Sequence, residues 1–303
     1  MTVTEAPPTP AVPSARRLTE RSTSTGRRVR NLLATVGVWL AVGCAVVPLG
    51  FVIYAVARRG TGIMSLSFLT QDIPQRTRTP GPGMGPAVVG TLVTTGMASA
   101  MAIPLGILAA VYLNEYGARN KLATVLRFLS DVMAGVPSIV MGLFIFTIWV
   151  LPLKERGLSA FAGSLALACL MLPIVIRTTE AMLKLVPRDL REASYGLGAR
   201  KSRTIMTVVL PAALPGVVSG CLLAVARAAG ETAPLLFTIG ITNKRNFHLT
   251  GSNTTLSAQI FNNASQPFPA AIERAWGAAL TLILIVVVLS TLGRLVAARF
   301  TVR

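Results

Sequence analysis

The sequence predicts an all-α integral membrane protein with six transmembrane helices. Of its 303 residues, 52% are hydrophobic and 13% are charged, whereas about a quarter of a soluble chain is charged. The apolar residues gather in long runs, each able to cross about 30 Å of hydrocarbon as a helix. A lipid-facing backbone has to satisfy its own hydrogen bonds, which favours helices. This composition excludes collagen-like and disordered chains, except at the N-terminal end.

The chain begins with a tail rich in Pro, Ser, Thr and Arg. Residues 1–30 contain almost nothing to bury, so we expect a disordered, basic, cytoplasmic tail. The first apolar run follows at residues 32–57. This run exceeds the roughly 7–15 residues of a signal-peptide core, so we interpret it as an uncleaved first span. Residues 31–303 then form the transmembrane domain.

Five further spans complete the prediction. We place them at residues 87–113, 125–151, 160–176, 205–229 and 275–297. The fourth is expected to end at residue 176, because polar residues begin at Arg177. An apolar piece at 234–241 is interpreted as a broken or re-entrant continuation of the fifth span. Prolines 104, 137, 173, 211, 215 and 234 lie within or beside spans, which suits the broken helices of transporters and equally suits packing kinks.

The net charge of +18 comes from 29 Lys and Arg against 11 Asp and Glu. No basic-aromatic stripe or nucleic-acid motif accompanies this charge, so we expect no nucleic-acid partner. The lipid bilayer is the better partner, because basic loops remain in the cytoplasm and meet anionic headgroups. With both termini cytoplasmic, the inside segments hold about twice as many Lys and Arg as the outside ones. The sequence therefore predicts a multi-pass plasma-membrane protein with both termini in the cytoplasm.

Residue types that carry catalysis are scarce. Cys44, Cys169 and Cys221 lie in apolar runs without CxxC spacing, and His248 is the only histidine, so we expect no disulfide framework, no metal site and no histidine-based catalysis. The nearest approach to a phosphate-binding loop, residues 198–202, has Arg200 where glycine is needed. We therefore predict a protein that is not an enzyme, has no catalytic residues and binds no cofactor.

The longest inside loop, at about residues 185–204, predicts a short helix. Pro187 suits a helix start, and Asp189 lies near the positive end of the helix dipole. Leu190, Ala193 and Leu197 are spaced to share one small apolar face. Two glycines, 196 and 198, suit the left-handed turn that ends such a helix. The helix is interpreted as a docking element, and the alternative is an amphipathic helix on the membrane surface.

Two acid–base pairs stand inside or beside the apolar runs. Arg177 and Glu180 are three residues apart, and Arg227 and Glu231 are four apart, so each pair is expected to meet on one helix face. A charge at the centre of a span costs roughly 2.5–3.5 kcal/mol, which favours a polar interior. We interpret the four residues as an oxyanion path, in which arginine binds the anion. The alternative is two self-neutralised pairs that only fix helix packing.

The loop sequence resembles the cytoplasmic loop signature of ABC importer permeases, E-A-A-x3-G-x9-I-x-L-P. The matching positions are Glu192, Ala193, Ser194, Gly198, Val208, Leu210 and Pro211, with Ser194 and Val208 as mild substitutions. The resemblance implies a type I ABC importer permease fold. It also implies that the loop couples the spans to a separate ATPase.

Four further stretches resemble the permease subunits of the bacterial phosphate-specific ABC importer. They are GMGPAVVGTLVTTG from Gly83, AGVPSIVMGLF from Ala134, LPIVIRTTEAM from Leu172 and ARAAGETAPLL from Ala226. With the loop, the resemblance covers roughly residues 83–300. It implies a substrate path at Arg177, Glu180, Arg227 and Glu231, with a helix bend near the path at Gly135, Pro137 and Ser138. The AWGAAL stretch from Ala275 looks more like the A-type subunit than the C-type.

The resemblance implies one subunit of an ATP-driven importer that moves inorganic phosphate by alternating access. Its partners would be a homologous permease in a heterodimer, two ATPase subunits that hold ATP and Mg, and an extracytoplasmic phosphate-binding protein. The outside loop at about 242–273 is expected to form part of the docking rim, and its glycosylation motifs at Asn253 and Asn263 are interpreted as chance. The carboxylate of Glu180 or Glu231 would favour hydrogen phosphate, whose O–H it can accept, over sulfate.

Three alternatives remain for the function. A permease for another oxyanion or small nutrient would keep the coupling loop without the two pairs. A proton-coupled secondary transporter would use the pairs as a relay but would need no docking helix. A membrane-embedded enzyme would need a constellation of catalytic groups for which the sequence offers little material.

Overall fold

The computed structural model describes residues 25–81, 83–117, 120–154 and 157–299. Every regular element in these ranges is a helix, and η1, η2 and η4 are π-helical. In chain order the elements are α1 (Thr25–Gly60), α2 (Leu66–Thr70), α3 (Gly85–Val111), η1 (Tyr112–Tyr116), α4 (Lys121–Gly135), α5 (Ser138–Ile145), η2 (Phe146–Val150), α6 (Leu151–Leu153), α7 (Ala160–Leu185), α8 (Arg188–Gly196), α9 (Lys201–Thr204), η4 (Ile205–Val209), α10 (Leu210–Gly230), α11 (Ala233–Thr238), α12 (Leu256–Ala264) and α13 (Pro269–Arg299).

The chain divides into two units, residues 1–54 and residues 55–303. The described part of the first unit is most of α1, whose apolar side chains are almost all exposed within the chain, as suits a helix surrounded by lipid. Residues 25–30, predicted to belong to a disordered tail, are instead the first turns of α1. The rest of the predicted tail, residues 1–24, lies outside the described residues.

Five continuous helices are long and apolar enough to cross a membrane. They cover Gly26–Gly60, Gly85–Tyr116, Ala160–Leu185, Lys201–Gly230 and Pro269–Leu295. The prediction that the fourth span ends at residue 176 is wrong, because α7 continues to Leu185. Beyond residue 176, Arg177 and Glu180 have oppositely charged partners on the neighbouring helix α4.

The third predicted span, residues 125–151, is not one straight helix. The segments Lys121–Gly135 and Ser138–Leu153 meet at an angle of 106°. At 1.5 Å per residue each segment is about 22–24 Å long, shorter than the hydrocarbon core. The described chain therefore has five continuous spans, and a sixth only if this bent pair is counted as one.

α7 is the central helix of the second unit, and it packs against α3, α4, α5, α10 and α11. α3 carries a stripe of small residues four apart, all of them buried: Gly90, Thr94, Ala98, Ala102, Gly106 and Ala110. Such stripes let helix backbones approach closely in membranes. A Cβ atom at Gly106 would lie 2.6 Å from a methyl carbon of Val175. The two helices are thus held at a distance that a larger side chain would prevent.

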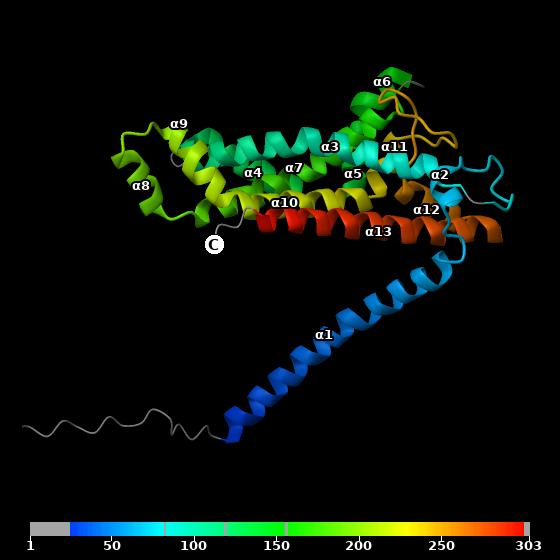
Figure 1. Ribbon diagram of the computed structural model, residues 1–303, viewed down its shortest axis with the longest axis horizontal. Helices are drawn as coiled ribbons and strands as arrows, with labels where there is room; N and C mark the ends of the chain where they lie inside the picture. Colours follow the sequence, from blue (N-terminus) through cyan, green and yellow to red (C-terminus); the bar gives the residue numbers. More distant parts are fainter. Residues whose placement is uncertain (1–24, 82, 118–119, 155–156, 300–303) are drawn as a thin grey trace, which may run out of the picture. The chain divides into compact units, whose positions relative to one another are not determined.

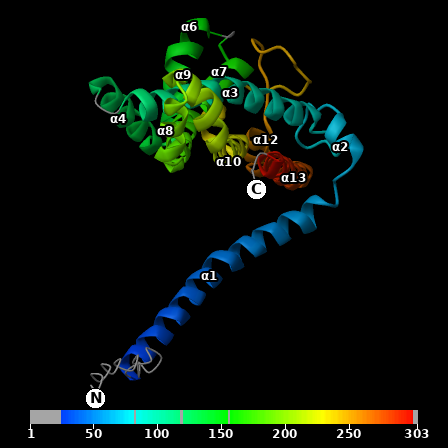
Figure 2. The ribbon, with the colours of Figure 1, turned by 60° about the vertical axis from the view of Figure 1, so that its left-hand side comes forward.

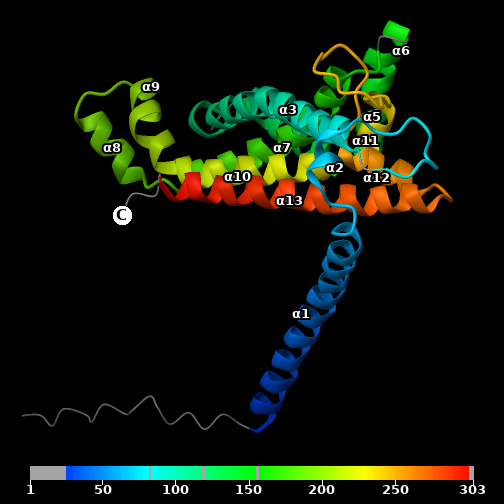
Figure 3. The same cartoon turned by 45° about the vertical axis from the view of Figure 1, so that its right-hand side comes forward.

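The loops of the second unit gather at two opposite ends of the bundle (Figure 1). One end carries α8, α9 and the last turns of α13, and we call it the α8 end. The other carries α2 and α12, and we call it the α12 end. Figure 3 shows the same separation from another side, and Figure 2 brings the α8 end forward. The predicted coupling loop and the predicted outside loop therefore lie at opposite ends.

The α12 end is built around buried polar residues. α12 packs against α13 and α3, and the backbone N–H of Leu256 donates to Thr91 Oγ1 of α3 at 2.9 Å. The oxygen of Thr254 approaches α3 so closely that a Cβ atom at Gly90 would lie 1.8 Å from it. Glycine at position 90, within the stretch that begins at Gly83, is therefore required for this approach.

Candidate substrate path and coupling loop

The predicted path residues form two groups at different depths of the bundle. Arg177 and Glu180 lie on α7, whereas Arg227 lies near the end of α10, and Glu231 follows it. In the antiparallel contact of these helices, Gly216 meets Met182 and Gly220 meets Thr178. This register places Arg227 about six residues, or about 9 Å, nearer the α12 end than the level of Arg177.

Arg177 makes an ion pair with Asp131 of α4. The predicted pairing of Arg177 with Glu180 is wrong, although the two residues lie on one helix as expected. α4 runs alongside α7 with Arg127 and Asp131 four residues apart, so Arg177 and Glu180 of α7 each find an opposite charge across the interface. The side chains of Arg177 and Asp131 are 42% and 55% exposed, which leaves this pair open to the surroundings of the chain.

Glu180 lies in a closed environment. Its side chain is 1% exposed, and Oε1 accepts from Arg127 Nε at 3.0 Å and from Lys184 Nζ at 2.9 Å. Arg127 also donates to the carbonyl oxygen of Leu113 at 2.6 Å. Oε2 is buried without a hydrogen-bond partner among the described residues. Glu180 thus joins α7 to α4, and a translocated ion has no direct access to it.

The pairing of Arg227 with Glu231 is confirmed. Arg227 Nε lies 3.6 Å from Glu231 Oε1, and the two side chains are 67% and 18% exposed. Glu231 stands at the break between α10 and the short helix α11, which covers most of the apolar piece 234–241. The backbone oxygen of Glu231 accepts from Ser257 Oγ at 2.9 Å, so α12 holds this break in place.

The predicted helix bend lies where the sequence places it. α4 ends at Gly135, and Pro137 immediately precedes Ser138, the first residue of α5. Pro137 cannot continue the helical hydrogen bonding of α4. α5 packs on α7 and α11, and Gly142 of α5 contacts Pro234 of α11. The bend therefore leads to the helix that follows Glu231.

Sequence reasoning missed Arg127 and Asp131 as members of these groups. Asp131 lies inside the apolar run 125–151, and the rule that marks intramembrane charges as functional candidates would have found it. Arg127 lies near the start of the same run. Its partner is 53 residues away in sequence, so no local spacing points to the pairing.

The coupling loop forms the helix that the sequence predicts. α8 begins at Arg188 after Pro187 and ends at Gly196, and Gly198 has φ +81°, a left-handed conformation that favours glycine. Glu192 and Ala193 are exposed, whereas Ser194 Oγ lies 2.9 Å from Thr204 Oγ1 of α9. Leu210 and Pro211 open α10, as the signature implies.

A groove of about 900 Å³ separates α8 from α9 and η4. Its lining residues are Leu190, Ala193, Ser194, Leu197, Gly198, Ala199, Arg200, Ser202, Arg203, Thr207 and Val208. Leu197 is 90% exposed and Leu190 is 46% exposed. Exposed apolar residues around a hollow are typical of a protein-binding surface.

The expectation that the polar residues of the outside loop form a docking rim is wrong for residues 253–263. Asn253, Thr254, Ser257, Gln259 and Asn263 are all buried. They hydrogen-bond among themselves and to neighbouring elements. The longest exposed stretch of the loop is 244–250, apart from residue 246.

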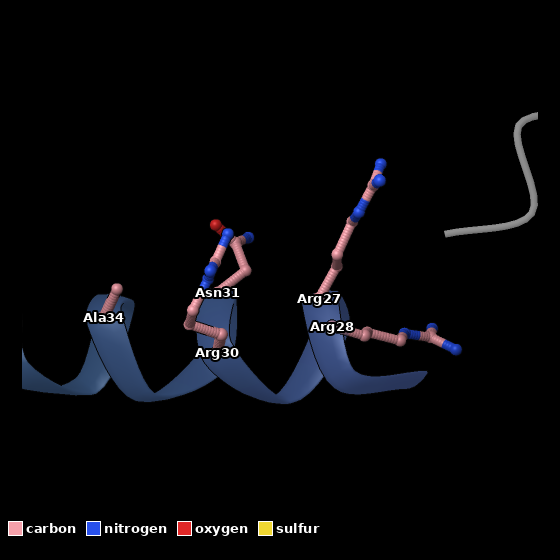
Figure 4. A pocket seen from close by; sticks show the side chains of 5 residues that line it. All are labelled: Arg27, Arg28, Arg30, Asn31 and Ala34. Atoms are coloured by element: carbon pink, nitrogen blue, oxygen red, sulfur yellow. The ribbon is translucent and has the colours of Figure 1, made fainter. Parts of the chain in front are cut away.

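Another hollow lies on the described part of the first unit. It is lined by Arg27, Arg28, Arg30, Asn31 and Ala34 of α1. Figure 4 shows the side chains of Arg27 and Arg28 projecting from one open helix surface without enclosing a space. The arrangement suits contact with anionic headgroups better than capture of a solute. Among the described residues, no three His, Cys, Asp or Glu are grouped so that they could hold a metal ion.

Comparison with known proteins identifies the family. The model of the binding-protein-dependent transport system inner membrane component matches residues 102–302. The chain belongs to this permease family. ABC importers of this kind work with an ATPase and a substrate-binding protein, so the permease has both kinds of partner and is a multi-pass membrane subunit rather than an enzyme.

Relatives of the permease include two proteins named as phosphate transport system permeases. PstA 1 of Mycobacterium tuberculosis is 43% identical over 268 residues, which cover 86% of this chain and 85% of the relative. PstA of Yersinia pestis is 41% identical over 273 residues, covering 90% and 92%. The resemblance to the A-type phosphate permeases is therefore confirmed.

Solved structures support the fold. A chain of a bacterial alginate ABC transporter in complex with its pentasaccharide-bound periplasmic protein matches with a TM-score of 0.65 at 13% identity, covering 91% of the permease and 97% of that chain. A chain of the inward-facing MetNI methionine ABC transporter matches with a TM-score of 0.57 at 20% identity, covering 72% and 94%. The predicted all-helical type I permease fold is confirmed.

Proposed function

We propose that the permease carries inorganic phosphate into the cell by alternating access, driven by separate ATPase subunits. The observation that carries this proposal is the identity of 41–43% with phosphate transport permeases over most of the chain. The geometry adds a path for an anion, because arginines are exposed on helices that are otherwise apolar.

The path in this proposal follows Arg227, Glu231, Arg177 and Asp131. The Arg227 side chain is 67% exposed in a spanning helix, and lipid contact would cost roughly 2.5–3.5 kcal/mol. Its surroundings are therefore polar in the assembled protein, which fits a cavity shared with a second permease. In a heterodimer, the homologous permease forms the other side of this cavity. The bend at Gly135, Pro137 and Ser138 packs beside the path through α5 and α11.

The specificity role that the sequence assigns to Glu180 or Glu231 passes, in this proposal, from Glu180 to Asp131. Asp131 is exposed beside Arg177, whereas Glu180 is buried beneath its two basic partners. A carboxylate beside arginine accepts the O–H of hydrogen phosphate, and sulfate offers no such donor. Sites built to pair a donor discriminate against analogues that lack it. Glu180 in this proposal holds α4 against α7.

The α8 end is proposed to face the cytoplasm, together with both termini. α13 ends on the side of α8 (Figure 1), so one orientation gives the coupling loop and the C-terminus the same compartment. Each of two ATPase subunits, loaded with ATP and Mg, would grip one permease. On this permease the gripped residues are Glu192, Ala193, Ser194 and Gly198, with Leu210 and Pro211 opening the helix that moves. The phosphate-binding protein would dock at the α12 end, on the exposed residues of 244–250.

The experiment is transport by the four-subunit complex in lipid vesicles, with ATP on the ATPase side. We expect ATP-dependent uptake of phosphate and arsenate, and much less of sulfate. Arg227→Gln removes a charge-assisted contact worth about 1.5–3 kcal/mol and should lower phosphate transport about ten- to a hundredfold. Arg76→Gln, an exposed arginine at the α12 end, is the matched control and should transport like the parent.

A second variant tests the coupling role. Glu192→Lys should leave assembly intact and separate ATP hydrolysis from transport. Uptake that continues without ATP would contradict the proposal in favour of a secondary transporter. Sulfate transport equal to phosphate transport would contradict the substrate assignment, and normal phosphate flux in Arg227→Gln would assign that residue to packing alone.

A further inference from the structure

Glu115 is a buried acid at the α8 end to which no role has been assigned. It lies in η1, directly after α3, and its side chain is 4% exposed. Its Oε1 accepts from Arg191 Nη1 at 3.0 Å and from Asn114 Nδ2 at 2.7 Å. Its backbone oxygen accepts from Lys201 Nζ. Glu115 thus binds one basic side chain from α8 and a second basic side chain from α9.

Arg191 connects three elements. Its Nη1 binds Glu115, while its Nη2 donates to the backbone oxygen of Leu183, in the last turn of α7, at 2.8 Å. α7 and the α3–η1 segment both end at the α8 end, where the last carbonyl groups of a helix lack partners and carry partial negative charge. Lys201 also lies over the ring of Tyr116, 4.5 Å from its centroid. The basic side chains of the loop therefore cap two helix ends at once.

These contacts connect α8 to α3, which the covalent chain does not join directly. α8 is joined covalently to α7 and, through α9 and η4, to α10. In contrast, α3 lies far from α8 in sequence. The main packing partners of α8 among the described elements are α9 and η4. The contact of Arg191 with Glu115 therefore ties α8 to α3. α3 in turn packs along α7 through its small-residue stripe.

We propose that the ion pair between Glu115 and Arg191, with Lys201 on the Glu115 carbonyl, passes the movement of α8 to α3 during transport. We name these three residues the α3 latch. The proposal rests on the proposed ATP-driven function. Its residues are positioning residues, because they touch neither substrate nor nucleotide. With the latch intact, α3, α7 and α10 move together when α8 is pulled; without it, α8 moves α7 and α10 while α3 lags behind.

The test measures phosphate transported per ATP hydrolysed by the four-subunit complex in vesicles. In Arg191→Gln we expect ATP hydrolysis to remain within about twofold of the parent, while the phosphate-to-ATP ratio falls about tenfold. Arg191→Lys keeps the charge but cannot reach Glu115 and Leu183 together as the guanidinium does, so it should restore part of the ratio. Arg294→Gln, an exposed arginine of α13 near the same end, is the matched control and should keep the parental ratio.

The outcomes separate this proposal from the proposed function. If the parent complex shows no ATP-dependent phosphate uptake, the function itself fails. If the parent transports normally and Arg191→Gln keeps its ratio, the α3 latch is refuted while the function stands. Should Arg191→Gln not assemble, Lys201→Gln and Glu115→Gln decide, because each weakens the latch while leaving Arg191 on the Leu183 carbonyl. A parental ratio in both would equally refute the proposal.

Discussion

Replacing Glu180 by Gln tests whether this acid is structural or part of the path. The structure indicates a structural role for Glu180, because its carboxylate is buried and bound by Arg127 and Lys184. We therefore expect Glu180→Gln to lower the stability of the permease and to leave its preference for phosphate over sulfate unchanged.

The contacts of Glu180 determine how much stability the Glu180→Gln substitution should cost. A hydrogen bond to a charged group contributes about 1.5–3 kcal/mol and a neutral one about 0.5–1.5 kcal/mol, so the contact with Arg127 loses about 1 kcal/mol. The contact with Lys184 loses only a few tenths of a kcal/mol, because the lysine is largely exposed. The amide nitrogen replaces Oε2, which is buried without a partner, and an unsatisfied donor costs about 1–3 kcal/mol. The total is about 3 kcal/mol.

The assay is thermal unfolding of the purified complex, followed by transport of phosphate and sulfate in vesicles. A loss of about 3 kcal/mol corresponds to a fall in midpoint temperature of about 5–10 °C. Glu273→Gln, an exposed acid on α13, is the control and should unfold like the parent. An unchanged midpoint together with a shifted phosphate-to-sulfate ratio would refute the structural role and return Glu180 to the path.

Two other substitutions test the path and the fold. Asp131→Asn replaces the exposed carboxylate beside Arg177 with a neutral amide whose oxygen is a weaker acceptor, and we expect the phosphate-to-sulfate transport ratio to fall several-fold; an unchanged ratio would remove Asp131 from the path. Gly90→Ala places a Cβ atom 1.8 Å from the oxygen of Thr254, so we expect a loss of about 1–3 kcal/mol in thermal unfolding. Gly96→Ala on the same helix meets nothing within 4 Å and should be neutral or stabilising, because alanine favours helix by about 1 kcal/mol; equal behaviour of the two would contradict the close approach.

Local features of this permease were predictable from the sequence. α8 starts after Pro187 and ends before the left-handed Gly198 because both residues restrict or permit backbone angles by themselves. The break after α10 and the bend at Pro137 follow from the same local chemistry. The Arg227–Glu231 pair was also predictable, since four residues along a helix bring two side chains to one face.

Long-range features were not predictable in this way. Arg177 pairs with Asp131 rather than Glu180, because the choice depends on the register between α4 and α7. The bend angle of 106° is set by what α4 and α5 pack against, and the local proline determines only where the chain turns. The polar residues 253–263 look like an exposed loop in sequence, but backbone and side-chain partners on α3 and at Glu231 allow them to be buried.

The sequence by itself determined that this chain is a helical membrane protein with a coupling helix, since apolar run length and backbone preferences act within a few turns. Only the tertiary structure decided which charges are open to an ion and which are sealed in the bundle. The physical reason is that the cost of a charge in a membrane depends on its neighbours, and those neighbours come from helices far apart in the chain.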